Sequence, residues 1–322
     1  MKTPPTSIPE EDALVFNSGS SAIYAAIMAN IKSGDHIISV NKPYTWAQRL
    51  FDNILPRFNV KVTYVDGTAI DNFRNAVLPE TAIIYLESPN SLTFEIQDIR
   101  AVAQLGHVHK ILTIIDNSYC TPLYQNPLSL GIDLSLQSAS KYLGGHSDTV
   151  AGVLSGSKEL IQKIFNDQLL SNGSGITPFN AWLIIRGLRT LPIRLKQITS
   201  TTNQVIKFLK QHPKVEKVIF PFDPTNPQYE LAKSQMSGAC GLFSIILKTD
   251  SYHKIERFSF QLKHFLVAVS WGGYESLIMP QAAGIGPENF DAQIENHKLV
   301  RLFIGLEEDY LIEDLNQALE IL

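Results

Sequence analysis

The chain has 322 residues, of which 44% are hydrophobic, and a formal net charge of −4 with a pI of about 6.1. This length is ample for one large domain and a smaller one, and the charge excludes a strongly basic nucleic-acid or membrane-binding protein, so we expect neither partner. Two widely separated cysteines, Cys120 and Cys240, and the lack of a signal-like or long apolar run predict a soluble cytoplasmic protein. We expect no metal site.

Apolar runs of strand length alternate with helical patterns through the first half of the chain. This alternation predicts an α/β fold with a mostly parallel sheet wrapped by helices. The expected strands are residues 14–16, 36–40, 61–65, 82–86, 111–115, 134–137 and 149–154, and the expected helices include 22–31, 46–55 and 96–105.

A second, smaller unit is predicted in the last third of the chain. A helical pattern over residues 178–211 ends at His212-Pro213, since proline cannot continue a helix. Strand-like runs at 215–220 and 242–247 and a final helix at 308–322 follow. We therefore expect a large domain at 1–210 and a small α/β domain at 211–322.

The first strand is followed by a turn of small residues, Asn17-Ser18-Gly19-Ser20-Ser21, and then by a helix. A strand, a small-residue turn and a helix N-terminus commonly hold a phosphate, because free backbone N–H groups and the helix dipole face the anion. Many such turns are only N-caps, and the turn alone leaves both interpretations open.

Asp116 ends the apolar run 111–115. An acidic residue at the carboxyl end of a buried strand lies at the edge where open α/β sheets bind ligands. A carboxylate there can keep a pyridine nitrogen protonated, which makes the ring an electron sink.

The most informative stretch runs from Ser138 to Asp148, Ser-Ala-Ser-Lys-Tyr-Leu-Gly-Gly-His-Ser-Asp. It places Lys141 among hydroxyls and glycines at a strand end, where desolvation lowers the pKa of a lysine and frees its amine to attack an aldehyde. Ser138 and Ser140 flank it and can bond phosphate oxygens. A buried lysine can instead be a structural ion-pair partner. Together, the lysine, the carboxylate and the phosphate-binding turn indicate pyridoxal 5'-phosphate (PLP).

The chain resembles the Cys/Met-metabolism family of PLP-dependent enzymes, of fold type I, from about Glu11 to the C-terminus. The ordered matches are Ser18-Gly19, Gly34-Asp35-His36 with Tyr44, Glu87-Ser88-Pro89, Ile115-Asp116-Asn117, the lysine stretch, Arg186 to Leu191, Ser270 to Ser276 and Val300 to Glu307.

The resemblance implies a role for each candidate residue. Lys141 would attach the cofactor and act as general base, and Asp116 would pair with the pyridinium. Tyr44 would stack on the ring as a catalytic and cofactor-binding residue, or else is an ordinary half-buried tyrosine. The phosphate would be bound by Ser18, Gly19, Ser20, Ser138 and Ser140.

A second group of residues is expected to bind the substrate. Arg301 lies in the apolar run 299–304, where a clamp on the substrate carboxylate explains its charge, although a buried salt bridge is the alternative. Ser270 touches the same carboxylate, and Trp271 lines the pocket or fills the core. His146 is expected to be structural.

Within the family, the motifs around Trp271 are most similar to those of bacterial cystathionine β-lyases. They imply β-elimination of cystathionine or a related sulfur amino acid to pyruvate, ammonia and a thiol, in a homodimer or homotetramer. The alternatives are a γ-lyase or γ-synthase, or a poorly active binding form. Val269 departs from the tyrosine or glutamate of relatives, and a front segment with a Tyr-x-Arg motif has no counterpart before Glu11.

Overall fold

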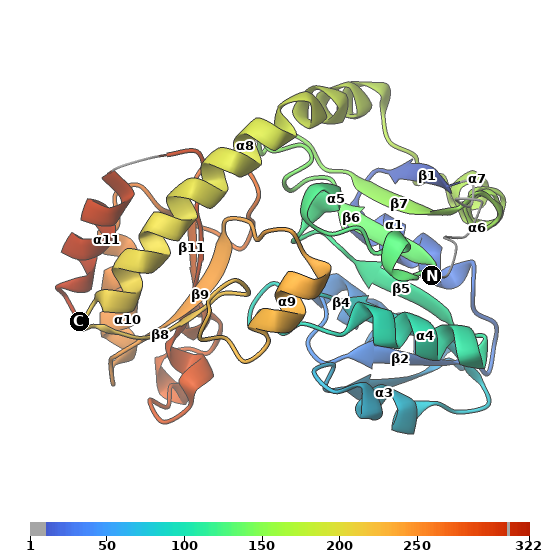
Figure 1. The fold of residues 1–322 in the computed structure, drawn as a ribbon, viewed down its shortest axis with the longest axis horizontal. Helices are drawn as coiled ribbons and strands as arrows, with labels where there is room; N and C mark the ends of the chain where they lie inside the picture. The colour runs from blue at the N-terminus through green and yellow to red at the C-terminus, as the bar shows by residue number, and fades with distance from the viewer. Residues whose placement is uncertain (1–10, 308–309) are drawn as a thin grey trace, which may run out of the picture.

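The computed structural model describes residues 11–307 and 310–322. Two sheets form two units, joined by one long helix (Figure 1). The predicted α/β class, with a mostly parallel large sheet and a smaller C-terminal unit, is confirmed. The long helix ends at Gln211, beside the domain boundary that we predict at residues 210/211. Residues 1–10 of the predicted large domain lie outside the described part.

The large sheet has the strand order β1-β7-β6-β5-β4-β2-β3. Only β7 runs antiparallel to its neighbours β1 and β6, and the other pairs are parallel. The carboxyl ends of β4, β5 and β6 therefore lie side by side at one edge. The strands are β1 Glu11–Phe16, β2 His36–Val40, β3 Lys61–Val65, β4 Thr81–Glu87, β5 Leu112–Asp116, β6 Leu134–Ser138 and β7 Gly152–Ser157.

Helices cover both faces of this sheet, because apolar side chains project from both sides of its central strands. One apolar core packs α1 against β5, β6 and β7, and another packs α3 and α4 against the opposite face. The helices of this unit are α1 Gly19–Met28, α2 Thr45–Arg49, α3 Ile70–Ala76, α4 Ile99–His109, α5 Thr121–Tyr124, α6 Lys158–Ile164 and α7 Leu170–Asn172.

The helix α8, Pro178–Gln211, runs from the large unit to the small one (Figure 1). Thr177 caps its start by accepting a hydrogen bond from the N–H of Asn180 at 3.2 Å, and the helix ends at His212 before Pro213. The predicted bounds of this helix are confirmed. No helix of the described residues has the length and apolar composition that a membrane span requires.

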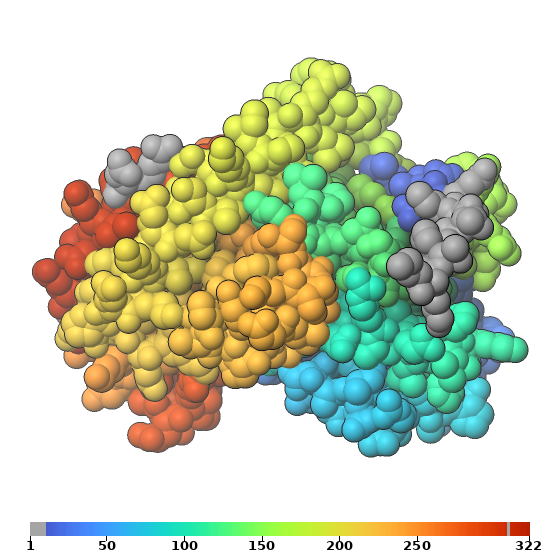
Figure 2. Space-filling model, viewed as in Figure 1, coloured from blue at the N-terminus to red at the C-terminus, as the bar shows by residue number. Residues whose placement is uncertain are grey.

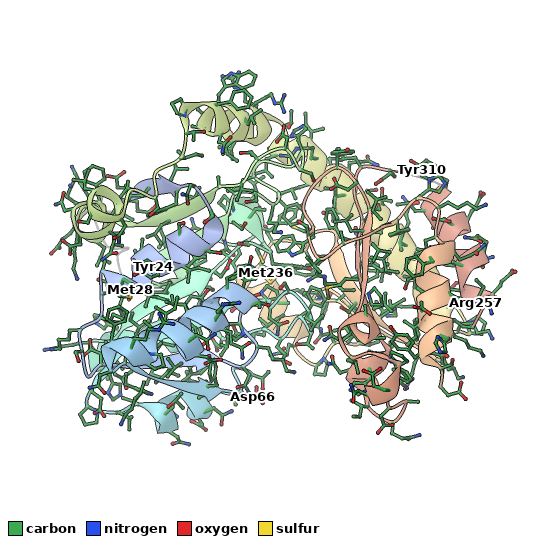
Figure 3. All side chains as sticks on the ribbon, turned by 180° about the vertical axis from the view of Figure 1, so that it is seen from behind. Tyr24, Met28, Asp66, Met236, Arg257 and Tyr310 are labelled. Carbon is green, nitrogen blue, oxygen red and sulfur yellow. The ribbon has the colours of Figure 1, made fainter. Side chains whose placement is uncertain are left out.

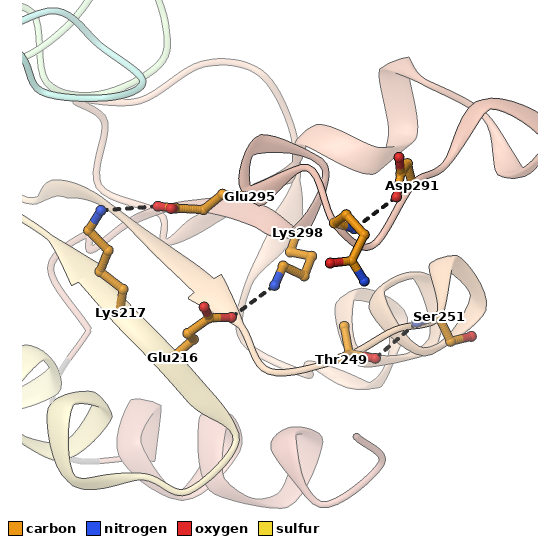
Figure 4. A network of polar contacts seen from close by, with 8 residues as sticks. Glu216, Lys217, Thr249, Ser251, Asp291, Glu295 and Lys298 are labelled. Carbon is orange, nitrogen blue, oxygen red and sulfur yellow. Dashed lines mark hydrogen bonds and ion pairs between the residues drawn. The ribbon is translucent and has the colours of Figure 1, made fainter.

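The small sheet has the order β10-β11-β12-β9-β8. Two ion pairs hold its edge strand against the segment before β12: Glu216 with Lys298 at 2.9 Å and Lys217 with Glu295 at 3.0 Å (Figure 4). The elements are β8 Val215–Ile219, α9 Tyr229–Gln235, β9 Leu242–Leu247, α10 Tyr252–Gln261, β10 Leu266–Val267, β11 Leu277–Pro280, β12 Leu299–Phe303 and α11 Tyr310–Leu319.

Two glutamines next to and within α9 join the units. Gln228 accepts from the N–H of Ile96 at 2.9 Å and donates to its carbonyl at 2.6 Å. Gln235 accepts from the N–H of Ile99 at 3.3 Å and donates to the carbonyl of Gln97 at 2.9 Å. Figure 2 shows the orange segment with α9 directly against the large unit, and Figure 3 shows Met236 at the junction from behind.

Several predicted boundaries were wrong. The expected helix 46–55 is α2 followed by a π turn, Leu50–Ile54, and a 3₁₀ turn, Leu55–Phe58. The expected strand 149–154 begins only at Gly152, because Ala151 bonds the Ser140 hydroxyl instead. The expected helix 96–105 starts at Ile99, since Asp98 is its N-cap. Likewise α1 starts at Gly19, capped by Ser18, three residues before the expected start. Residues 308–309 of the expected last helix lie outside the described part.

Candidate functional site

Three strand ends and one loop bring the candidate residues together. Glu87 ends β4, Asp116 ends β5 and Ser138 ends β6. Glu87 and Asp116 are direct partners in the register of the sheet. The chain continues from Ser138 into the turn that carries Lys141, so the site lies at the carboxyl edge of the large sheet, as expected for this fold class.

Lys141 is partly buried, and its amine donates to the hydroxyl of Ser270 at 2.9 Å. The amine also lies 5.3 Å from the ring centroid of Trp271. Burial, and secondarily the positive charge of Arg301, lowers the pKa of Lys141 to about 8, although Asp116 acts in the opposite direction. About a tenth of the amine is therefore neutral and nucleophilic at pH 7, far more than for an ordinary lysine.

Gly272 lets the segment with Ser270 and Trp271 approach the lysine. Its φ is +86°, and a Cβ there would lie 2.8 Å from the nitrogen of Tyr142 and 2.9 Å from the Cα of Lys141. Any other residue would be strained and would press on the lysine turn. The glycine thus explains how the small unit closes over Lys141.

Hydrogen bonds to neighbouring segments hold the turn that carries Lys141 (the lysine turn). The hydroxyl of Ser140 donates to the carbonyl of Ala151 at 3.2 Å and accepts from its N–H at 3.0 Å. The buried guanidinium of Arg194, on α8, donates to the carbonyl of Tyr142 at 2.9 Å. These bonds make Ser140 part of the support of the turn.

Asp116 and Glu87 form a buried pair of carboxyl groups. Asp116 accepts from the N–H of Ser118 at 2.9 Å. Burial raises the pKa of Asp116 and, together with the neighbouring Asp116 charge, raises the pKa of Glu87. Two adjacent carboxyls out of water cannot easily both be charged, so this pair favours a cationic partner.

The start of α1 faces the same edge. Ser18 is its N-cap and accepts from the N–H of Ser21 at 3.0 Å, while the first-turn N–H groups of Gly19 and Ser20 have no acceptor within the helix. A Cβ on Gly19 would lie 3.2 Å from Ser138, and one on Gly152 would lie 2.3 Å from the Ser18 carbonyl. Glycines at both positions let the helix start meet the ends of β6 and β7.

Tyr44 caps α2 and is 39% exposed. Burial raises the pKa of the Tyr44 phenol, and the Ser20 side chain acts in the opposite direction. The tyrosine therefore borders the helix start from one side.

Arg301 lies on β12 and is buried. Its guanidinium donates to the carbonyls of Val269 at 2.6 Å and Ser91 at 3.1 Å. Among the described residues no carboxylate forms an ion pair with it, and burial lowers its pKa to about 10. A buried guanidinium with unused donors calls for an anion.

These groups fit PLP. An amine with a lowered pKa suits the aldehyde, a buried carboxyl suits the ring nitrogen, and unpaired N–H groups at the start of α1 suit the phosphate. In the described residues no cluster of His, Cys, Asp or Glu is suited to a metal ion. A cavity of about 660 Å³ at the opposite edge, beside Lys32 and Glu80, includes none of the site residues.

Glu87 belongs to one of the motifs matched in the sequence, but the sequence alone assigned it no role. The signal was available, because Glu87 ends a buried strand just as Asp116 does. The support from Arg194 was also missed, since it depends on how α8 packs. His146, which was expected to be structural, lies with its Nδ1 2.7 Å from the carbonyl of Gly144.

Comparisons with known proteins agree on one family. A model described as Cys/Met metabolism PLP-dependent enzyme matches residues 9–320. The chain is 35% identical over 316 residues to a cystathionine γ-lyase of Bacillus subtilis, covering 96% of this chain and 82% of that protein. It is 38% identical over 318 residues to an L-methionine γ-lyase of Treponema denticola, covering 96% and 79%. It is 37% identical over 315 residues to an L-alanine/L-glutamate racemase of Wolbachia pipientis, covering 95% and 76%.

Proposed function

Because the chain belongs to the Cys/Met metabolism PLP-dependent enzyme family, we propose that it is a carbon–sulfur lyase acting by γ-elimination on a sulfur amino acid. The family and the cofactor PLP are as the sequence predicted. The β-elimination predicted from the motifs is not confirmed, because the relatives described above are named γ-lyases and a racemase. The observation that carries the proposal is this similarity to γ-lyases over nearly the whole chain.

The substrate is a sulfur amino acid with sulfur on Cγ, such as methionine or cystathionine. With one water, γ-elimination breaks the Cγ–S bond and the Cα–N bond, and releases a thiol, ammonia and α-ketobutyrate. Bound PLP supplies the electron sink for the negative charge that develops at Cα. The protein supplies the binding, the orientation and the proton movements.

Arg301 binds the substrate α-carboxylate with the donors that Val269 and Ser91 leave free, and Ser270 lies beside it. This places Cα next to Lys141. The amine of Lys141 takes the Cα proton, and its lowered pKa favours the neutral form that can do so. Trp271, which is buried and beside the amine, excludes water from that proton.

On the cofactor side, Asp116 would keep the pyridine nitrogen protonated and Tyr44 would lie against the ring. The N–H groups of Gly19 and Ser20 and the hydroxyl of Ser138 would hold the phosphate, whereas the Ser18 hydroxyl is already engaged with Ser21. Ser140 supports the lysine turn through Ala151 and is the least suited of the proposed phosphate contacts, because its hydroxyl is already engaged.

Val269 is 77% exposed, and its carbonyl accepts from Arg301. An apolar side chain here offers no partner for the distal amino group of cystathionine, so the proposal favours methionine-like substrates over cystathionine.

The purified protein, loaded with PLP, tests the proposal when supplied with methionine or cystathionine. Release of α-ketobutyrate supports γ-elimination. Release of pyruvate from cystathionine would restore the β-lyase prediction. Conversion of L-alanine to D-alanine without keto-acid release would instead indicate racemisation, which requires the same loss of the Cα proton.

A second copy of the chain is the partner we propose, as a homodimer or homotetramer. Phe179, Trp182 and Ile185 lie at spacings of three along α8, and each is more than half exposed. Apolar side chains gathered on one helix face favour burial against another molecule. Sedimentation of Trp182→Ser should show weakened association, whereas Phe260→Ser, which changes an exposed side chain on α10, should not.

A further inference from the structure

Glu87 uses both of its carboxyl oxygens on backbone N–H groups. One oxygen accepts from Tyr44 at 2.6 Å and the other from Ser91 at 3.2 Å. The residue is only 6% exposed. No carboxyl–cation pair involving Glu87 is formed within residues 11–307 and 310–322, so the group serves as an acceptor for two separate chain segments.

The two segments lead to opposite sides of the site. Tyr44 is the N-cap residue of α2, and its phenol is close enough to Ser20, at the start of α1, for Ser20 to influence its pKa. Ser91 lies in the loop after β4, and its carbonyl accepts from Arg301 at 3.1 Å. A continuous path therefore runs from Tyr44 through Glu87 and Ser91 to Arg301.

The surroundings of Glu87 make these bonds strong and directional. Asp116 on β5, Tyr85 on β4, Tyr44 on α2 and Arg301 on β12 are the titratable groups that face it. Burial and the charge of Asp116 raise the pKa of Glu87, while the N–H groups of Tyr44 and Ser91 act to lower it. In water-excluded surroundings an acceptor bond is stronger and an unpaired N–H is costly. A displaced Glu87 carboxyl would leave two such groups without a partner.

We propose that Glu87 is a positioning residue that couples the tyrosine beside the cofactor to the arginine that binds the substrate carboxylate. The inference rests on the proposed function, because the roles of Tyr44 and Arg301 are part of it. With Tyr44 held in place, Glu87 would be fixed through the Tyr44 N–H, and Glu87 would in turn fix Ser91, whose carbonyl orients the guanidinium of Arg301. By linkage, carboxylate binding at Arg301 tightens the hold on the cofactor by the same factor.

The variant Glu87→Gln tests this coupling. Glutamine has the same shape and keeps one acceptor oxygen, but its NH₂ group cannot accept, so either Tyr44 or Ser91 loses the partner of its N–H. We expect KM for the amino acid to rise about tenfold and kcat to change much less, as for one buried N–H left without its acceptor. The dissociation constant of PLP, measured by absorbance titration, should rise several-fold, while the melting temperature falls by only a few degrees, as for one unpaired buried N–H. Glu95 lies on the same loop, and its carboxylate accepts from the Thr93 hydroxyl, so Glu95→Gln is the control and should leave all these values as in the wild type.

A second variant and a double mutant keep the inference falsifiable. Glu87→Asp keeps the carboxyl group but is too short to reach both N–H groups, so it should also raise KM. Combined with Arg301→Lys, Glu87→Gln should add less than its separate effect, because both act on one path. Additive effects, or an unchanged KM in Glu87→Gln, would overturn the coupling while leaving the proposed function intact. Failure of the wild-type protein to bind PLP would overturn both.

Discussion

The amine of Lys141 and the hydroxyl of Ser270 lie 2.9 Å apart, although 129 residues separate them in the chain. Lys141 follows a strand of the large sheet, and Ser270 lies between two strands of the small one. The surroundings that lower the pKa of the lysine therefore come from both units. Neither unit alone would give the amine this reactivity.

Lys141→Ala should abolish covalent attachment of PLP while leaving the fold intact, because the amine projects into the site and is not part of the core. Borohydride treatment of the loaded wild-type protein, followed by peptide mapping, should label Lys141. The exposed Lys196 on α8 is the control position, and its alanine variant should be labelled as in the wild type. Label on a different lysine would show that the anchor is misassigned.

The rate of that attachment should depend on pH in a defined way. The pKa of Lys141 is lowered to about 8, so the fraction of neutral amine rises up to that pH and then levels off. An ordinary lysine would keep gaining reactivity up to about pH 10.4. Absorbance changes on mixing PLP with cofactor-free protein at a series of pH values measure this. A rate that continues to climb well above pH 9 would contradict the lowered pKa.

Arg301→Lys should weaken amino-acid binding and leave PLP content unchanged. Lysine keeps the charge but loses the planar fork that can bond Val269, Ser91 and a carboxylate together. We expect KM to rise by roughly tenfold or more, as for the loss of a bond to a charged group. Arg257→Lys on α10, at the far end of the small unit (Figure 3), is the matched control. Equal KM values for wild type and Arg301→Lys would mean that Arg301 serves only the protein's own structure.

Gly187→Ala should destabilise the protein despite favouring the helix. Alanine gains about 1 kcal/mol in a helix interior, but its Cβ would lie 2.3 Å from the carbonyl of Gly144 in the lysine turn. Overpacking of this kind costs about 1–3 kcal/mol, so we expect a lower melting temperature and weaker PLP binding. Gly284→Ala, which meets nothing within 4 Å, is the control. A higher melting temperature for Gly187→Ala would contradict this, because it would mean that α8 can shift away from the lysine turn at little cost.

The parts of the site that depend on local sequence were the predictable ones. Asp116 ends an apolar run and Lys141 follows one, so their positions at the sheet edge follow from strand length and parallel order. The start of α1 was recognised from its small residues, although the helix begins three residues earlier than expected, because Ser18 caps it.

Contacts between distant segments could not be predicted from residue spacing. The bond from Arg301 to Ser91 spans 210 residues, and that from Glu87 to Tyr44 depends on how the loop before α2 turns back to the end of β4. Distant contacts also bear on the start of α4. Asp98 caps that helix, and the backbone of Ile96 and Gln97 before it bonds to Gln228 and Gln235.

The contacts between the two units differ in how they respond to pH and salt. Gln228 and Gln235 each donate and accept through uncharged amides, and at neither does a proton have to be gained or lost. Salt and pH act mainly on charged groups, so these two contacts do not depend on a titration. The bond from Lys141 to Ser270 does involve a group that titrates, so the units are joined by a titrating contact in the site and by uncharged contacts away from it.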